Sequence, residues 1–189
     1  MNSTSDQAQP LGIENSMDLL IALLYSPGKR QTQAEPIEGI TRLQKLMFLL
    51  QQGVGPKQLV QDAEAYGFRP YKMGPYAPQI VRDVEELTAA GIVASKRLEY
   101  MLPDDSDVAT ASLADPDALP ERTKRIESYL YFLTDDLGRR VGEELWASLA
   151  ATQRDDLSRF KSFFNSLSLR QLLIYTYEKF PDYTTEGNP

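Results

Sequence analysis

Apolar residues recur every three or four positions over much of the chain, a spacing that predicts amphipathic helices. The first such stripe consists of Met17, Leu20, Ile21 and Leu24. The Ser-Pro-Gly run at residues 26–28 ends this helix. Similar stripes predict helices over about 41–52, 57–66 and 78–90, and three more after residue 134. The chain is therefore expected to be mainly helical.

Polar residues mark the starts of several of these helices. Thr41 with Gln44, and Ser168 with Gln171, have the spacing of a capping box, in which two side chains satisfy free backbone N–H groups. Thr134, followed by two aspartates, predicts another start, because carboxylates favour the positive end of the helix dipole. These residues fix the expected helix boundaries.

Two segments break the helical spacing and are typical of strands. Residues 92–102 alternate imperfectly between apolar and polar side chains, and residues 126–133 are expected to pair back on them. Residues 103–121 between them hold three prolines and six acidic residues without a Lys or Arg, which we interpret as a long loop. A shorter extended segment with a tight turn is expected at 68–76.

The order helix, helix, helix, two-stranded hairpin is that of a winged-helix domain. The predicted fold class is mainly α within α+β, with a winged-helix-like unit, a two-stranded hairpin and additional C-terminal helices. The expected parts are a flexible tail at 1–14, a winged-helix-like domain at 15–133 that includes the acidic loop 103–121, a C-terminal helical extension packed on it at 134–183, and a tail at 184–189.

Composition narrows the chemistry. With 42% hydrophobic and 25% charged residues, a packed core is expected. The chain has no Cys and no His, which excludes Ser-His-Asp and Cys-His nucleophile systems and leaves only carboxylates for a zinc ion. We therefore expect no enzymatic activity, no cofactor and no metal. Carboxylates that hold a divalent ion remain as a distant enzymatic alternative.

The net charge and the absence of long apolar runs bear on partners and location. A net charge of −7 weighs against DNA binding, because affinity for a duplex comes mainly from Lys and Arg on phosphates. No apolar run approaches the roughly 20 residues of a membrane helix. The first ten residues lack the pattern of a signal peptide. A cytoplasmic protein without membrane association is therefore expected.

Two motifs resemble a known family. The helix GITRLQKLMFLL at 39–50 and the turn YKMGPY at 71–76 resemble the YwgA-like bacterial proteins and, more distantly, the Panacea domain of SocA-type antitoxins. These families share a T-x-L-Q-K-L helix and an aromatic-x-x-G-P turn that leads into a helix. The end LLIYTYEKFP at 172–181 resembles the YwgA-like end. The resemblance implies a protein that neutralises a toxin by direct binding.

The candidate protein-binding site lies around the Gly-Pro turn. Tyr residues flank the turn, and exposed Tyr is typical of binding hot spots. Two cations share a helix face at i, i+3 spacing. The candidate residues are Arg42, Lys45, Tyr71, Lys72 and Tyr76. The structural alternative is that Gly-Pro only builds the turn and that the two cations form ion pairs with acids such as Glu38.

The alternative function is a winged-helix transcriptional regulator that binds DNA. Its candidate contacts are Arg82, Lys96, Arg97, Arg122, Lys124 and Arg125. A continuous positive face over these cations would favour DNA, whereas interleaved carboxylates would favour protein. Outside its apolar face, the helix at 78–90 offers one cation against three carboxylates. We therefore expect an antitoxin-like or adaptor protein that binds another protein in a toxin–antitoxin or phage-defence setting, with a homodimer left open.

Overall fold

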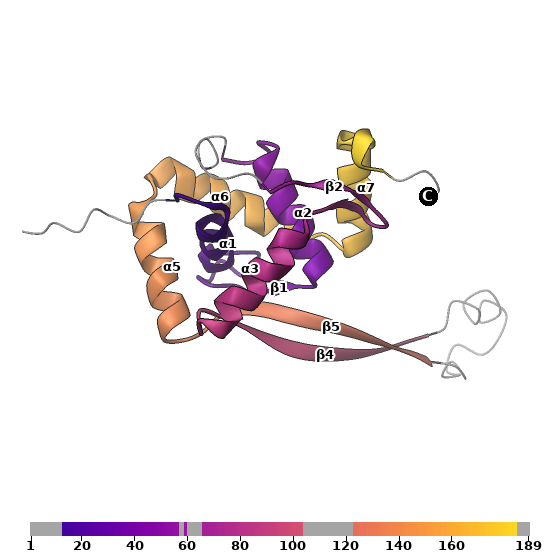
Figure 1. The fold of residues 1–189 in the computed structure, drawn as a ribbon, viewed down its shortest axis with the longest axis horizontal. Coiled ribbons are helices and arrows are strands. Elements are labelled where there is room, and N and C mark those ends of the chain that lie inside the picture. Colours follow the sequence, from indigo (N-terminus) through magenta and orange to yellow (C-terminus); the bar gives the residue numbers. More distant parts are fainter. Residues whose placement is uncertain (1–12, 57–58, 60–65, 104–122, 185–189) are drawn as a thin grey trace, which may run out of the picture.

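The computed structural model describes residues 13–56, 59, 66–103 and 123–184, and within them the chain is α+β (Figure 1). The helices are α1 Ser16–Tyr25, α2 Ile40–Gln51, α3 Pro78–Ala89, α5 Leu137–Ser148, α6 Ala151–Phe164, α7 Leu169–Lys179 and the 3-10 turn η1 Pro181–Tyr183. The strands are β1 Ile37–Glu38, β2 Arg69–Tyr71, β3 Gly74–Tyr76, β4 Val93–Pro103 and β5 Thr123–Leu133. The expected helix at 57–66 lies outside the described residues, apart from its positions 59 and 66.

The larger sheet has the order β1-β5-β4 and is antiparallel throughout. The predicted pairing of two strands is confirmed, with a register that runs from Val93 opposite Leu133 to Pro103 opposite Thr123. Val93 and Leu133 are buried at the base, whereas the far part of this β4–β5 ribbon extends beyond the helices (Figure 1). The expected acidic loop 103–121 begins at Pro103, which is the last residue of β4, and the rest of it lies outside the described part of the chain.

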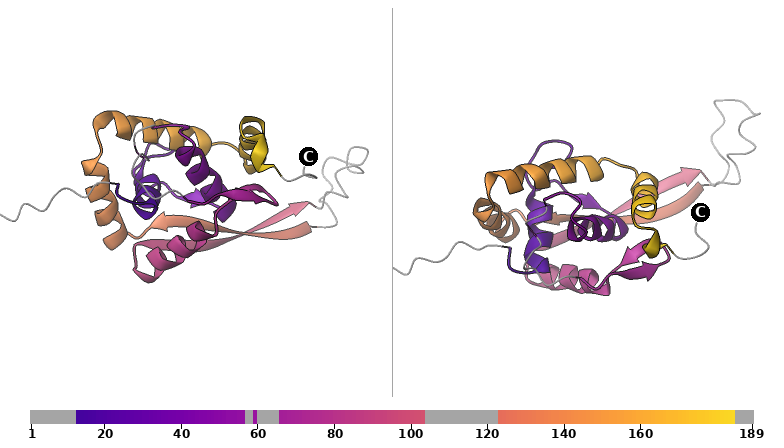
Figure 2. Two further views of the ribbon diagram at one scale, coloured as in Figure 1. Left: turned by 45° about the horizontal axis from the view of Figure 1, so that its top comes forward. Right: turned by 90° about the horizontal axis from the view of Figure 1, so that it is seen from above.

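The core lies around α1 and α2. Six consecutive residues of α1, from Leu19 to Leu24, and eight of α2, from Leu43 to Leu50, are buried. Figure 2 shows, from above, that α5, α6 and α7 curve around these two helices while α3 lies on the other side. Side chains from α5, α6 and α7 belong to the same apolar cluster as those of α1 and α2. The C-terminal helices therefore complete one shared core.

Phe48 of α2 gathers rings from two distant segments. Its ring centroid lies 5.2 Å from that of Phe68, 5.0 Å from that of Phe180 and 4.7 Å from that of Tyr183, with edge-to-face geometry in each case. This arrangement is favourable for aromatic rings because the positive edge of one ring meets the negative face of another. The cluster fixes the end of α7 and η1 against α2.

Of the two predicted capping boxes, one is confirmed and one is wrong. Ser168 and Gln171 form the expected capping box of α7. The pair Thr41–Gln44 does not cap α2, because that helix begins at Ile40 after Gly39 and has no side-chain cap. The first turn of α2 already lies against neighbouring elements. The Gln44 side chain instead forms hydrogen bonds with the backbone of Ala77.

The junction at Thr134 joins three elements. Its Oγ1 accepts a hydrogen bond from the N–H of Gly138 (2.8 Å) and donates one to the carbonyl of Gly91 (2.7 Å). The helix α5 itself starts at Leu137, later than the sequence suggested.

Among the described helices, none combines the length and apolarity needed to cross a bilayer.

Candidate functional site

The β2–β3 hairpin presents the two tyrosines that the sequence singled out. Tyr71 at the end of β2 lies opposite Gly74, and Tyr76 at the end of β3 lies opposite Arg69. The two ring centroids are 5.1 Å apart and the ring planes are tilted by 32°. Tyr71 is 48% exposed and Tyr76 is partly buried. The rings therefore form an accessible aromatic pair.

The turn of this hairpin adds an apolar and a basic side chain. Met73 is 42% exposed and Lys72 is exposed beside it. We call Tyr71, Lys72, Met73 and Tyr76 the hairpin surface. Sequence reasoning found all of these except Met73, which stands alone in a polar turn without any periodic pattern around it.

Lys45 holds the hairpin from below and does not belong to its exposed surface. The residue is only 2% exposed, and its Nζ donates a hydrogen bond to the carbonyl of Pro75 at 2.8 Å. Burial lowers the pKa of Lys45 to about 8. The sequence placed this ammonium group on an accessible face, which is wrong because the hairpin covers it.

Gln44 fixes the chain just after the hairpin. Its Nε2 donates to the carbonyl of Ala77 and its Oε1 accepts from the N–H of Ala77, both at 2.9 Å. This double hydrogen bond satisfies the backbone of the residue that precedes α3. Because Gln44 and Lys45 are consecutive on α2, one turn of that helix anchors both β3, at Pro75, and the residue just after it, Ala77.

Gly74 is required by both backbone angle and space. Its φ of +82° lies in the region that favours glycine, and a Cβ atom there would lie 2.6 Å from a carbon of the Tyr177 ring. The structural interpretation of the Gly-Pro turn is thus supported, and it is compatible with a binding role for the tyrosines beside it.

Arg42 is directed to the C-terminal helices. Its Nη1 donates to the carbonyl of Leu167 at 2.7 Å and to that of Phe164 at 3.2 Å. These carbonyls lie at the end of α6 and in the link to α7, where they lack helical partners. Arg42 is only partly exposed, so neither member of the predicted Arg42–Lys45 pair is a free surface cation. The ion pairs with Glu38 that we considered as the alternative do not form either.

Three of the cations proposed for DNA, Lys96, Arg97 and Arg125, are spread over both faces of the β4–β5 ribbon. Side chains alternate along a strand, so Lys96 and Arg97 point to opposite faces. Arg97 forms ion pairs with Glu127 and, at 3.2 Å, with Glu99. Arg125 forms one with Glu99 at 2.9 Å. Carboxylates therefore interleave with the cations on that face. Arg122 and the side chain of Lys124 lie outside the described part of the structure.

The exposed side of α3 has a mixed charge. Arg82 donates to the Oε1 of Gln79 through its Nε (3.0 Å) and Nη2 (2.7 Å). Glu85 and Glu86 are exposed on the same helix. Asp83, which the sequence placed on the polar side, is buried at 4% exposure. Its position three residues after a buried isoleucine was the signal that could have identified it.

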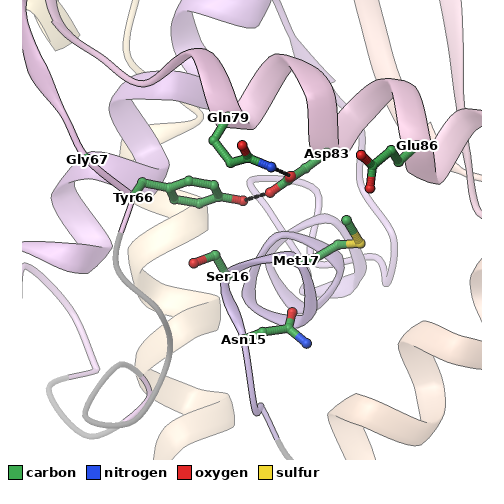
Figure 3. A pocket seen from close by; sticks show the side chains of 8 residues that line it. All are labelled: Asn15, Ser16, Met17, Tyr66, Gly67, Gln79, Asp83 and Glu86. Carbon is green, nitrogen blue, oxygen red and sulfur yellow. Dashed lines mark hydrogen bonds between the residues drawn. The ribbon is translucent and has the colours of Figure 1, made fainter.

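A shallow hollow of about 540 Å³ opens beside this buried carboxylate (Figure 3). The hydroxyl of Tyr66 donates to Asp83 Oδ2 at 2.5 Å, and Gln79 Nε2 donates to Oδ1 at 2.6 Å. Burial, followed by the bond to Asp83, raises the pKa of Tyr66. The lining residues are Asn15, Ser16, Met17, Tyr66, Gly67, Gln79, Asp83 and Glu86. The Oδ2 of Asp83 thus fastens α3 to the segment before β2, whereas its Oδ1 accepts a hydrogen bond from within α3.

Neither metal chemistry nor a known relative points to another site. Among residues 13–56, 59, 66–103 and 123–184, no three His, Cys, Asp or Glu side chains gather as a metal ion would require. Comparison with known proteins gives no match to a family model, to a curated protein or to a solved structure. The hairpin surface is therefore the candidate site that the geometry favours.

Proposed function

We propose that this chain is a non-enzymatic regulator that acts as an antitoxin-like protein or as an adaptor. It binds its partner protein through the hairpin surface. The observation that carries the proposal is the Tyr71–Tyr76 ring pair, in which Tyr71 is exposed and Tyr76 is partly buried. Tyrosine buries a large area at little cost in side-chain entropy, which makes it common at binding hot spots. The adjacent Met73 adds an adaptable apolar contact.

The rigidity of the hairpin supports the same proposal. Lys45 and Gln44 hold its second strand and the residue after it through three hydrogen bonds. A surface that is already ordered loses little conformational entropy when a partner binds, so more of the contact energy appears as affinity. The resemblance of residues 39–50 and 71–76 to YwgA-like and Panacea proteins agrees with a binding role.

We further propose that the unit is a winged helix. In support, β1 lies between α1 and α2 and pairs with β5, the second strand of the ribbon, to give the order β1-β5-β4. This arrangement is the one observation that favours DNA binding. The fold alone does not imply that function. The ion pairs of Arg97 and Arg125 and the two exposed glutamates of α3 weigh against it.

The test is a pull-down from lysate of the native host with tagged wild-type protein, with and without nuclease, read by mass spectrometry. Two variants are compared, Tyr71→Ala in the hairpin surface and Tyr129→Ala on β5. Tyr129 is the matched control, because it is 44% exposed, close to the 48% of Tyr71. Any recovered partner is then titrated directly against the three proteins.

We expect one stoichiometric protein that withstands nuclease and binds Tyr71→Ala about tenfold more weakly, or roughly 1.4 kcal/mol. Tyr129→Ala should bind it as the wild type does. Circular dichroism checks that both variants fold. Equal losses for both variants would remove the hairpin surface from the proposal. Recovery of nucleic acid that is lost with rising salt would favour the DNA-binding alternative.

A further inference from the structure

The outer edge of β4 is an unpaired strand edge. In the sheet order β1-β5-β4, β4 has β5 on one side and no other described strand on the other. The edge is long, because β4 spans Val93–Pro103, and Met101 on it is 62% exposed. Edges of this length readily pair with another strand unless their side chains prevent it.

The backbone hydrogen bonds show which residues of β4 can pair outward. The N–H of Thr134 donates to the carbonyl of Ile92, and these two residues continue the β4–β5 register. Backbone groups alternate in direction along an antiparallel strand. The N–H and C=O groups of the even-numbered residues of β4 therefore point to β5. Those of the odd-numbered residues point outward, which are here Ser95, Arg97, Glu99 and Met101.

Among registers centred on Arg97, Leu98 or Glu99, the charges on this edge favour one for pairing with a second copy. In a two-fold dimer, β4 of one copy runs antiparallel to β4 of the other, and the axis passes between the same residue of the two strands. Centring on Arg97 or on Glu99 would place two like charges directly opposite each other, which destabilises a sheet. Centring on Leu98 instead places Arg97 opposite Glu99 of the second copy, twice. It also places Lys96 opposite the Tyr100 ring of the second copy.

We propose that two copies of this chain associate through β4, antiparallel and centred on Leu98. Within one chain Glu99 lies directly opposite Glu127 and forms ion pairs with Arg97 and, on the β5 side, with Arg125. Arg97 of the second copy supplies a cation on the open side. The dimer is expected to be weak, because pairing of two strand edges buries less area than a standard interface. The proposal does not depend on the proposed function, since the hairpin surface lies on other strands.

The absence of cysteine allows a direct test by crosslinking. Leu98→Cys places the only thiol of each chain at the two-fold axis, in a non-hydrogen-bonded pair with Cα atoms about 4.5 Å apart. Lys96→Cys, on the same face of β4, is the matched control. Its two thiols would be offset by four residues, on the order of 13 Å along the strand, too far for a disulfide.

We expect the Leu98→Cys protein to form a covalent dimer under mild oxidation much faster than the Lys96→Cys protein. Equal rates for the two variants, or no covalent dimer with Leu98→Cys, would overturn the register. Circular dichroism confirms that both variants fold. Sedimentation of wild-type protein over a concentration series measures the dimer without any substitution.

A mixing experiment tests the charge pairing with Leu98 intact. In a dimer of the Arg97→Glu variant, the new carboxylate would lie opposite Glu99 of the second copy. In a dimer of the Glu99→Arg variant, the new guanidinium would lie opposite Arg97 of the second copy. Each variant alone should therefore sediment as a monomer. An equimolar mixture should recover dimers, because an acidic edge then meets a basic one. The effects of each substitution within its own chain are the same before and after mixing, so they cannot produce this rescue.

The control for the mixing experiment is Arg125→Glu. It breaks the ion pair with Glu99 inside the ribbon but lies on β5, away from the outer edge, and should dimerise as the wild type does. A mixture of the two β4 variants that stays monomeric would overturn the proposal. So would wild-type protein that stays monomeric at concentrations on the order of 1 mM.

Discussion

Within the described part of the chain, three basic side chains donate hydrogen bonds to backbone carbonyls. Arg42 donates to the carbonyl of Phe164 at the end of α6, Lys45 to a carbonyl of the β2–β3 hairpin, and Lys161 to the carbonyls of Leu24 (2.9 Å) and Ser26 (2.7 Å). The last two carbonyls lie at the C-terminal end of α1, which carries the negative end of its dipole. Each cation thus satisfies carbonyl groups at or near the end of a helix or on a hairpin strand, and ties two elements together.

Lys161 predicts a pH-dependent stability. Burial lowers its pKa from 10.5 to about 7, although nearby Glu35 acts in the opposite direction. Between these two values the unfolded chain binds more protons than the native protein. The free energy of unfolding therefore rises with pH over this window, by at most about 1.4 kcal/mol per pH unit from this residue.

The measurement is urea unfolding at several pH values between 7 and 9.5, for wild type and for Lys161→Met. The methionine variant should be less stable, because two buried carbonyls lose their donor, and its stability should rise less steeply with pH. Lys45 remains in both proteins and contributes equally to both curves. Parallel curves would show that Lys161 keeps its proton throughout this range.

Sequence reasoning misplaced Arg42 and Lys45 for a physical reason. Lysine is almost never fully buried, so Lys45 in an amphipathic helix is expected to be at the surface. Its burial depends on a hairpin that follows later in the chain and on a carbonyl, that of Pro75, which no side-chain pattern reveals. Tyr71 was placed correctly, because a ring beside a tight turn has no neighbouring element to cover it.

At the scale of elements, local signals predicted more than long-range pairing did. The helix α3 and the strands β4 and β5 lie close to their expected bounds, because each carries a long hydrophobic pattern. The strand β1 was missed because two residues are too few for alternation. Its pairing with Tyr131 and Leu130 of β5 comes from the sheet and not from its own sequence.

The β2–β3 hairpin gives a prediction at this scale. Gly74→Ala should lower the free energy of unfolding by about 1–3 kcal/mol, because the residue adopts a positive φ and its new methyl group would meet the Tyr177 ring. Gly53→Ala is the matched control, since its φ is also positive, at +72°, but nothing lies within 4 Å of the added carbon. Its loss should be the smaller one.

Urea midpoints compare the two glycine variants. The difference between them isolates the contact with Tyr177 of α7 from the backbone strain that both share. Equal losses would mean that the ring moves aside without cost, and that the hairpin is held to α7 less firmly than the distance implies.

At the scale of the whole molecule, the distribution of charge disfavours binding to nucleic acid. The chain carries a net charge of −7, and two exposed cations of the ribbon, Arg97 and Arg125, form ion pairs with glutamates. We predict no binding of the wild type to short duplex DNA at about 150 mM salt, with a dissociation constant weaker than roughly 10⁻⁴ M. Fluorescence anisotropy with a labelled duplex measures it.

A charge-reversed variant provides the comparison for the DNA assay. Glu85→Lys combined with Glu86→Lys makes the exposed side of α3 basic, and it should gain weak, salt-dependent binding if the helix can approach a duplex. Tight, salt-dependent binding by the wild type would instead show that its cations act together, and the protein-binding proposal would then lose its electrostatic support.

The ring cluster on Phe48 also orders events during synthesis. Phe180 and Tyr183, which cover this ring, are translated after α2, the ribbon and α6. At about 5–20 residues per second, the delay is on the order of ten seconds. During that time the apolar side of α2 leaves the ribosome without its final cover. A nascent chain stalled before η1 is therefore a natural client for chaperones and proteases.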